Sequence, residues 1–353
     1  MALVRKTFRS AAATDFSIFE HLRPIRSALV VLAVLSLVYK LADVRALLPI
    51  GIGMLFAAIA DKGNSLRRRL TSMCGATIAI TAGTCVGCLV SDNQILHVAI
   101  GGLVGLVCGL AGVTGLPAMT AGVLGLVVFT IFSGSPIELL DVKTNTLLML
   151  LGACLMIVSV LAEFVVRAAL KSVPTAEGEM PSESIWSRSK IHFHWTDLFV
   201  LHAIRLAGVI VVATILEEVL KFPHSYWIPM TVAWISRPDR DGTVEKVTLR
   251  VAGTLLGVAV SGLLIGLTPA GSAESLVLIA LASYVVLAFL APNYAVAVIG
   301  ITVFVFFLFH LVGYPIDGSI KARVASTLIA TALVLLAVRI KFRPRANART
   351  TTA

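Results

Sequence analysis

Long apolar segments follow one another along almost the whole of this 353-residue chain, separated by short polar loops. A helix needs roughly 20 apolar residues to cross the hydrocarbon layer of a bilayer. Twelve segments are candidates, at about 28–46, 47–60, 71–90, 95–113, 116–133, 145–166, 198–216, 226–236, 249–267, 275–291, 294–313 and 322–340. With 58% hydrophobic and 14% charged residues, the chain could not enclose this apolar surface in a water-soluble core. The sequence therefore predicts an all-α membrane protein.

The order of the segments is repeated. The stretch from about Arg23 to Arg167 and the stretch from about His202 to Arg339 follow the same plan. Each begins with two basic residues three apart, followed by a short segment that contains a proline. A loop with an Asp and a Gly comes next, and then a helix with regularly spaced glycines. An acidic turn precedes the last apolar helix of each stretch. Such a repeat predicts two six-segment bundles related by a pseudo-two-fold axis, with any path at their interface.

Lys and Arg are concentrated on one side of the expected bilayer. Only six of the 29 lie at the other side; the rest lie mainly in the N-terminal tail, the loops 61–70 and 237–250, the segment 167–197 and the C-terminal tail. By the positive-inside rule both termini are cytoplasmic. Because each repeat has six crossings, both bundles have the same orientation and their axis runs along the membrane normal. This distribution accounts for the net charge of +10 without a nucleic-acid-binding surface.

Polar segments set the expected domain boundaries. No cleavable signal peptide is recognisable at the N-terminus, so the first membrane helix should itself direct insertion. The segment between the repeats begins with Pro, Glu and Ser residues typical of a flexible linker. We expect a cytoplasmic N-terminal segment at 1–22, a first repeat at 23–170, a cytoplasmic linker at 171–197, a second repeat at 198–342 and a basic cytoplasmic tail at 343–353.

Two of the segments, 47–60 and 226–236, are too short to span a bilayer, and they hold the same place in each repeat. A half-length helix leaves backbone groups free, which a membrane tolerates only where protein or a water-filled cavity satisfies them. Its N-terminus also presents the positive end of the helix dipole to an anion. The start of the second short segment reads Phe222 to Pro229, and the side chains of His224, Tyr226 and Trp227 there suit an aromatic or amphipathic acid. An interfacial aromatic belt with a helix start is the alternative.

Arginines within apolar segments are costly and are therefore candidates for a site. Arg205 lies in the first segment of the second repeat, seven residues past Leu198, and Arg26 matches it in the first repeat. Arg323 lies just inside the last segment. A guanidinium group stays charged and binds a carboxylate through two parallel hydrogen bonds, as an organic anion requires. The alternative is that these side chains reach lipid phosphates from a helix end, which is favoured for Arg26.

Other polar residues have structural interpretations. Glu217 and Glu218, next to Lys221, predict a solvated ion-pair cluster at an outer helix end. Glu163 and Arg167 predict a helix-end pair, and His310 predicts a hydrogen-bonded helix-end histidine rather than a proton relay.

Motifs for catalysis and for metal binding are lacking. Cys85 and Cys88 lack further ligands at metal-binding spacing and are interpreted as small residues at a helix contact. The glycine spacing of Gly83 and Gly87 predicts close helix packing. We find no metal cluster, nucleophile–base pair or phosphate-binding loop in the sequence, so neither an enzyme nor a cofactor is expected.

Three motifs of the second repeat resemble the fusaric acid resistance family: His202-Ala203-Ile204-Arg205, then Pro223-His224-Ser225-Tyr226-Trp227-Ile228-Pro229-Met230-Thr231-Val232, then Arg250-Val251-Ala252-Gly253-Thr254-Leu255-Leu256-Gly257. These are membrane domains of bacterial aromatic acid exporters and related inner-membrane proteins, distantly similar to plant aluminium-activated malate channels. The resemblance implies export of aromatic or other organic carboxylates by a six-helix unit that works in pairs. One chain would supply both units here.

The first repeat departs from this pattern. Ala46 and Leu47 stand where the second repeat has Tyr226 and Trp227, and Asn145 stands in place of an arginine. Many family members also carry a large cytoplasmic domain, which we do not expect here. The two sides of a central path are therefore not expected to be equivalent.

We therefore predict an inner-membrane exporter of organic anions, chiefly aromatic acids. Arginine side chains would neutralise the carboxylate, and aromatic side chains would contact the ring. A passive anion channel and a non-transporting scaffold are the alternatives. The expected partners are the anion and the lipid bilayer, with a periplasmic adaptor or a second copy of the chain left open. The predicted substrate-binding residues are His202, Arg205, His224, Tyr226, Trp227, Thr231 and Arg323.

Overall fold

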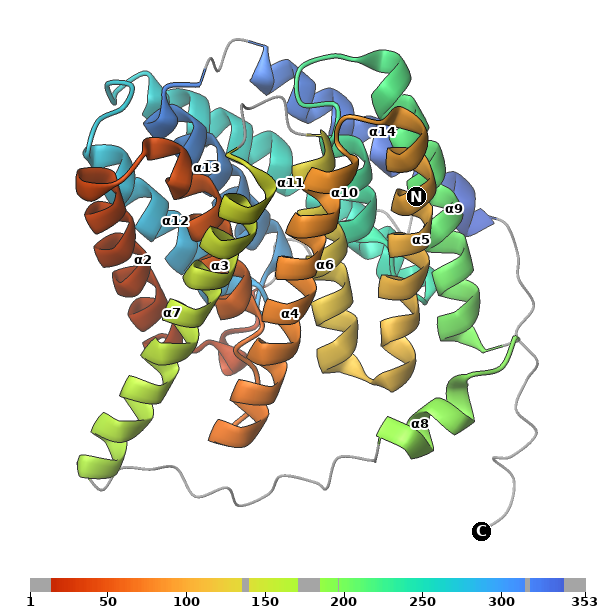
Figure 1. The fold of residues 1–353 in the computed structure, drawn as a ribbon, viewed down its shortest axis with the longest axis horizontal. Coiled ribbons are helices and arrows are strands. Elements are labelled where there is room, and N and C mark those ends of the chain that lie inside the picture. Colours follow the sequence, from red (N-terminus) through yellow and green to blue (C-terminus); the bar gives the residue numbers. More distant parts are fainter. Residues whose placement is uncertain (1–13, 135–139, 171–184, 196, 315–317, 340–353) are drawn as a thin grey trace.

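Helices make up all the regular structure that the computed structural model describes, in residues 14–134, 140–170, 185–195, 197–314 and 318–339 (Figure 1). The first half contains α2 Leu22–Leu41, α3 Leu47–Ile59, α4 Leu66–Val90, α5 Gln94–Leu110, α6 Leu116–Gly134 and α7 Val142–Ala169. The second half contains α9 Leu198–Leu220, α10 Trp227–Ile235, α11 Arg240–Ile265, α12 Glu274–Phe289, α13 Tyr294–Val312 and α14 Ser319–Arg339. Between the halves is α8 Ile185–His192, and short 3-10 turns are η1 Phe16–Ile18, η2 Val44–Ala46 and η3 Ala111–Thr114.

Nine of the described helices are long and apolar enough to cross a membrane. The predicted class, an all-helical membrane protein, is therefore confirmed. The shorter helices among the twelve are α3, α10 and α12, and the first two lie where the sequence predicts half-length helices. The acidic turn expected at Asp317, the Pro/Glu/Ser part of the linker and the basic tail lie outside the described residues.

Polar side chains set where several helices begin. Ser65, Asn93, Asp141, Asp197 and Asp239 each accept a hydrogen bond from a backbone N–H in the first turn of the next helix. Such an N-cap satisfies a donor that the helix itself leaves free.

The cap at Asp239 corrects one prediction. It starts α11 at Arg240, so the prediction of a cytoplasmic loop at 237–250 followed by a helix from 249 is wrong. Lys246 and Arg250 therefore lie about two and about three turns inside a helix rather than in a loop.

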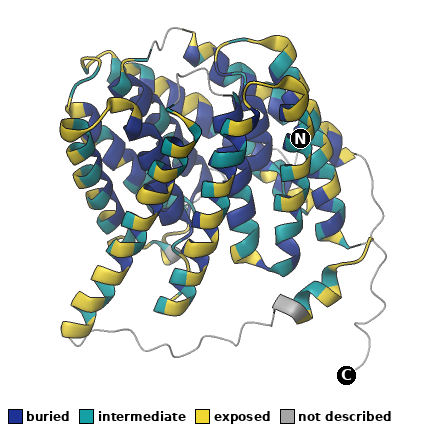
Figure 2. Ribbon diagram, in the orientation of Figure 1, coloured by how far each residue is buried: buried dark blue, intermediate teal, exposed yellow. Residues whose placement is uncertain are grey.

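The interior is formed by the short helices and their neighbours. Every residue of α3 and α10 is buried, and α6 and α13 are mostly buried, whereas the outer helices expose apolar faces (Figure 2). In the first half α4 packs on α6 and α3 on α7; in the second half α11 packs on α13 and α10 on α14. Between the halves α5 packs on α9, and α12 packs on α2. The exposed faces suit contact with lipid chains.

Glycine allows α4 to approach α6 closely. A Cβ added to Gly83 would lie 2.4 Å from the backbone oxygen of Gly125, whereas a Cβ on Gly75 of the same helix would meet nothing within 4 Å. We expect Gly83→Ala to push the helices apart and lower the free energy of unfolding by about 2 kcal/mol. Gly75→Ala should raise it by about 0.5–1 kcal/mol, because alanine favours the helix. Thermal unfolding of the purified variants measures both effects, and a gain in stability for Gly83→Ala would contradict the close approach.

Candidate functional site

A cavity of about 730 Å³ opens at the end of the molecule that carries α8, between the two halves. We call it the vestibule; its lining includes Ile59, Lys62, Thr120, Arg237, Lys246 and Tyr294. The short helices explain its position. At 1.5 Å per residue, α3 and α10 extend only about 20 and about 14 Å, well short of the roughly 30 Å of a hydrocarbon layer. Both end at the vestibule, which occupies the depth they leave uncovered.

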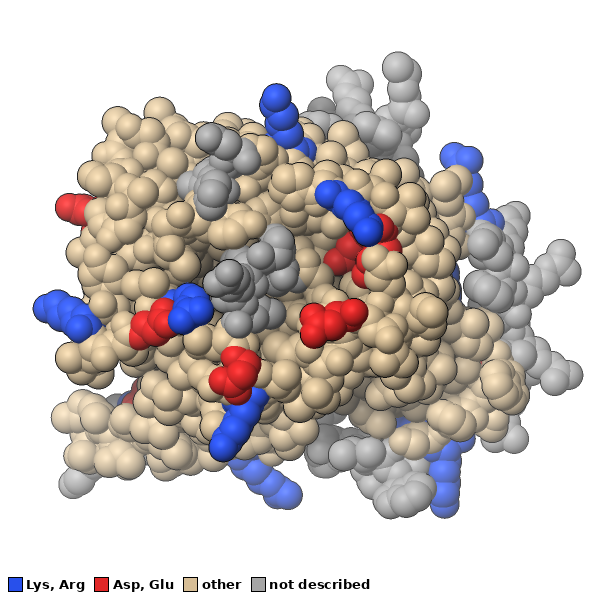
Figure 3. All heavy atoms as spheres, turned by 45° about the horizontal axis from the view of Figure 1, so that its top comes forward, with Lys and Arg blue, Asp and Glu red and all other residues tan. Residues whose placement is uncertain are grey.

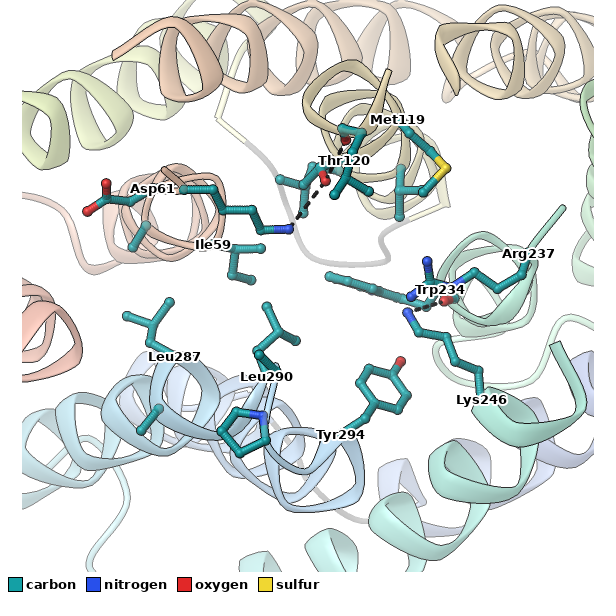
Figure 4. Close-up of a pocket in the computed structure, with 18 of the residues that line it drawn as sticks. Ile59, Asp61, Met119, Thr120, Trp234, Arg237, Lys246, Leu287, Leu290 and Tyr294 are labelled. Atoms are coloured by element: carbon teal, nitrogen blue, oxygen red, sulfur yellow. Dashed lines mark hydrogen bonds between the residues drawn. The ribbon is translucent and has the colours of Figure 1, made fainter. Parts of the chain in front are cut away.

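Positive side chains reach into this cavity from both halves. Lys62, in the loop after α3, donates to the Thr120 hydroxyl of α6 at 3.4 Å. From the other side, the Lys246 ammonium lies 4.4 Å from the centre of the Tyr294 ring and donates to the backbone oxygen of Trp234 at 3.4 Å (Figure 4). The second contact satisfies a carbonyl at the C-terminal end of α10. Neither lysine forms an ion pair with a carboxylate in the described part of the chain, so both are available to an anion in the vestibule.

Two arginines lie deeper in the second half. Arg250 is four residues beyond Lys246 on α11 and is fully buried, and Arg323 on α14 is 1% exposed. None of the three guanidinium nitrogens of Arg250, and neither terminal nitrogen of Arg323, has a hydrogen-bond partner in the described part of the chain. Their helices, α11 and α14, pack against each other. We call these two residues the arginine pair; a buried charge without a counterion is costly, which is typical of a binding site.

Aromatic rings adjoin the arginine pair. The guanidinium carbon of Arg323 lies 4.9 Å from the centre of the Trp227 ring, a cation–π contact. The His224 ring stacks on Trp227 at 4.5 Å with an interplanar angle of 17°, and its Nε2 lies 3.0 Å from the Ser319 hydroxyl. Tyr226 packs edge-on against Trp227 at 5.9 Å and is buried. Four of the predicted site residues, His224, Tyr226, Trp227 and Arg323, thus come together in one cluster.

The other predicted residues lie elsewhere. Thr231 is one turn further along α10, fully buried, and its hydroxyl has no partner among the described residues. His202 lines the vestibule. Arg205 donates hydrogen bonds to the backbone oxygens of Arg237 and Pro238. Its guanidinium group therefore holds the backbone that follows α10 and does not lie beside Arg323.

Arg26, the arginine of the first half that was matched to Arg205 in the sequence, forms ion pairs with carboxylates. Arg26 binds Asp61 and Glu163, and both carboxylates also bind Arg69. Glu163 also pairs with Arg167 at 2.8 Å, which confirms the predicted helix-end pair. The expectation that Arg26 reaches lipid phosphates is wrong, because its charge is satisfied inside the protein. We call Arg26, Asp61, Arg69, Glu163 and Arg167 the buried ion network.

Two predictions about local structure also need correction. The first amides of α10 are not free for an anion, because Trp227 and Ile228 donate to the backbone oxygens of His224 and Ser225.

The acidic residues at the end of α9 do not form a solvated cluster with Lys221. Glu217 is 5% exposed, and Glu218 Oε1 is hydrogen-bonded to His97 Nδ1 at 2.8 Å. His310, by contrast, is hydrogen-bonded to the Thr268 carbonyl at 2.9 Å, as predicted for a helix-end histidine.

Three residues of the site, Arg250, Lys246 and Tyr294, are not among the predicted substrate-binding residues. The N-cap sequence Asp239-Arg240-Asp241 was the signal that could have found the first two, since it starts the helix early enough to carry both side chains inward. No comparable signal in the sequence marks Tyr294, which follows a tight turn.

Known proteins resemble the part of the chain that holds this cluster. Residues 211–337, from the middle of α9 to the end of α14, match the fusaric acid resistance protein-like family. The chain is 29% identical over 154 residues to the inner membrane protein YccS of Escherichia coli, a match covering 44% of this chain and 21% of that protein. It is 30% identical over 147 residues to an uncharacterized protein of Haemophilus influenzae, covering 42% and 20%.

A third relative has a larger share of its own length matched by this chain. The uncharacterized protein ORF2 of Neisseria gonorrhoeae is 31% identical over 139 residues, which cover 39% of this chain and 33% of that protein. The matches to these three relatives thus span a third or less of each relative's length. No solved structure matches the chain significantly. The matched region contains Trp227, Arg250 and Arg323, so the part of the chain that is similar to the fusaric acid resistance protein-like family includes the arginine pair.

Proposed function

We propose that this protein transports organic anions, chiefly aromatic carboxylic acids, across the bacterial inner membrane. The observation that carries the proposal is the arginine pair, two buried guanidinium groups without a carboxylate partner among the described residues. A carboxylate placed between them would supply the missing charge and hydrogen-bond acceptors. The adjoining rings of His224, Tyr226 and Trp227 would contact an aromatic substrate, and the free hydroxyl of Thr231 would contact its polar substituents.

The vestibule supports a route to this site. Lys62 and Lys246 attract an anion at the α8 end, and Lys246 and Arg250 lie one turn apart on α11, so an anion could pass from one cation to the next. His202 would line the entrance, and Arg205 would hold the chain after α10 in place. This assigns positioning roles to these two residues and binding roles to the arginine pair.

Two six-segment bundles, 23–170 and 198–342, joined by the linker 171–197, are the architecture we propose for this transporter. The helix pairings support it, because α4 with α6 corresponds to α11 with α13, and α5 with α9 corresponds to α12 with α2. A pseudo-two-fold axis along the membrane normal relates such pairings. The end opposite α8 carries few and scattered charges of both signs (Figure 3), which supports a cytoplasmic α8 end and cytoplasmic termini.

Binding of aromatic acids tests the proposal directly. We expect benzoate to raise the melting temperature of the purified protein, because a ligand that binds only the folded state stabilises it by mass action. An aliphatic acid of equal charge should bind about three- to tenfold more weakly, since it cannot stack on the rings. Proteoliposomes loaded with labelled benzoate should release it faster than protein-free liposomes. No stabilisation and no flux with any acid of an aromatic and aliphatic panel would overturn the proposal.

A passive channel is distinguished by its currents. Planar-bilayer recordings of the same preparation should show no unitary currents if the protein is a carrier. Unitary anion currents that disappear in Arg323→Ala would instead make the arginine pair part of a channel.

A further inference from the structure

A second group of buried ionisable side chains lies where α5 of the first half packs against α9 of the second half. His97, near the start of α5, is 1% exposed. Glu217 and Glu218, near the end of α9, have side chains that are 5% and 23% exposed. The group lies toward the end of the molecule opposite the vestibule, because the C-terminal end of α9 is far from the end that carries His202.

The histidine bridges the two carboxylates. Its Nδ1 lies 2.8 Å from Glu218 Oε1, and its Nε2 lies 3.9 Å from Glu217 Oε2. Both Nε2 of His97 and Oε2 of Glu217 lack a hydrogen-bond partner in the described part of the chain. Two unsatisfied buried atoms therefore face one another across a gap slightly longer than a hydrogen bond.

The surroundings of Glu217 contain few charges. From α6 comes Gly134, where an added Cβ would lie 1.8 Å from Glu217 Oε1 and 2.5 Å from Tyr226 Cβ, so the carboxyl group and Tyr226 lie against the same glycine. Tyr226 also packs edge-on against Trp227, whose ring lies 4.9 Å from the guanidinium carbon of Arg323. Lys221 lies at the exposed end of α9. No ion pair joins Glu217 to a lysine or arginine among the described residues, and a buried carboxylate without a cation is costly unless it takes up a proton.

We propose that Glu217 is a proton-binding site, filled through Glu218 and His97, and that its protonation strengthens anion binding at the arginine pair; this rests on the proposed function. The partly exposed Glu218 takes a proton from water and passes it to Nδ1 of His97. The ring then releases its other proton from Nε2 to Glu217 Oε2. One proton is gained overall, and His97 ends neutral in the other tautomer.

The sign of the coupling follows from electrostatics. An ionised Glu217 opposes the positive potential that the arginine pair presents to an anion, and the contacts of Tyr226 and Trp227 connect the carboxyl group to Arg323. A proton on Glu217 removes this opposition, so each bound species favours the other, because linkage between two sites is reciprocal. The cluster therefore loads the proton and the anion together instead of exchanging one for the other.

Benzoate binding at two pH values tests the proposal, since this acid stays ionised at both. For the unmodified protein we expect the Kd to be about five- to tenfold lower at pH 6 than at pH 8. Glu217→Gln imitates the protonated state and should bind tightly at both pH values. Glu274→Gln removes an exposed carboxylate from α12 and should keep the pH dependence. An unchanged pH dependence in Glu217→Gln would overturn the proton site.

A second measurement needs no variant. Calorimetric titrations of the unmodified protein with benzoate, run at pH 7 in buffers with different heats of ionisation, report the protons taken up per anion bound. We expect net uptake, of up to one proton, and no uptake would overturn the proton site. If benzoate binds without proton linkage, the proposed function stands and this inference fails. If no acid on the panel binds at either pH, the proposed function fails with it.

Discussion

Replacing Arg250 with methionine is expected to abolish most anion transport and, at the same time, to make the protein more stable. The guanidinium group is fully buried and has no hydrogen-bond partner in the described part of the chain. Methionine fills a similar volume without a charge, and replacing buried charges by apolar side chains commonly stabilises by about 1–4 kcal/mol. We expect benzoate flux in proteoliposomes to fall at least about 30-fold, the cost of losing one charge-assisted contact to the carboxylate.

The same substitution at a paired arginine is the matched control. Arg69 is also buried, but it donates to Asp61 and Glu163. Arg69→Met should lower the free energy of unfolding by about 3–5 kcal/mol, because it leaves buried carboxylates with fewer cations. The opposite signs of the two stability changes would separate a functional charge from a structural one. A loss of stability in Arg250→Met as large as that in Arg69→Met would show that Arg250 has a structural partner.

Arg323→Lys tests geometry rather than charge. Lysine keeps the positive charge but loses the planar donor pair and much of the stacking on Trp227. Benzoate transport should therefore fall by about tenfold or more, whereas stability should change little.

The helix class and much of the aromatic cluster could be predicted from the sequence. Long apolar segments and polar caps fix where helices form, and the run from His224 to Trp227 is local, so its residues stay together in any fold of that segment. Arg323 could be placed just inside the last helix in the same way, but its contact with the Trp227 ring depends on how α14 packs on α10. Local signals of this kind survive folding because they depend on neighbours along the chain.

Contacts between distant segments could not be predicted in this way. Glu217 looked like one of a solvated pair with Lys221, but packing of α5 against α9 buries it beside His97. Arg26 and Arg205 looked equivalent, but the loop after α3 supplies the carboxylate of Asp61 where the chain after α10 supplies backbone oxygens. Single residues in the segments after α3 and α10 thus decide which arginines are neutralised.

Asp61→Asn should be among the most destabilising single changes in the described part of the chain. Its side chain is 3% exposed, and its two oxygens accept hydrogen bonds from Arg26 and Arg69. An asparagine leaves both guanidinium groups with only Glu163 as a carboxylate partner, and breaking a buried pair in this way costs about 3–5 kcal/mol. Asp43→Asn is the matched control, since its pair with Arg45 is more than 40% exposed and contributes about 0–1 kcal/mol. Unfolding of both variants in detergent measures the difference.

The pH dependence of stability identifies the same carboxylate. Burial alone would raise the pKa of Asp61, but hydrogen bonds from Arg69 and Arg26 outweigh it and lower the pKa below its usual value of 3.8. A lowered pKa in the folded state means that the stabilisation is fully present above the unfolded pKa and is lost as the pH falls through the folded one. The unmodified protein should therefore lose stability below about pH 4, and Asp61→Asn should lose less over that range. Equal acid sensitivity in the two proteins would mean that a group other than Asp61 causes the loss of stability at low pH.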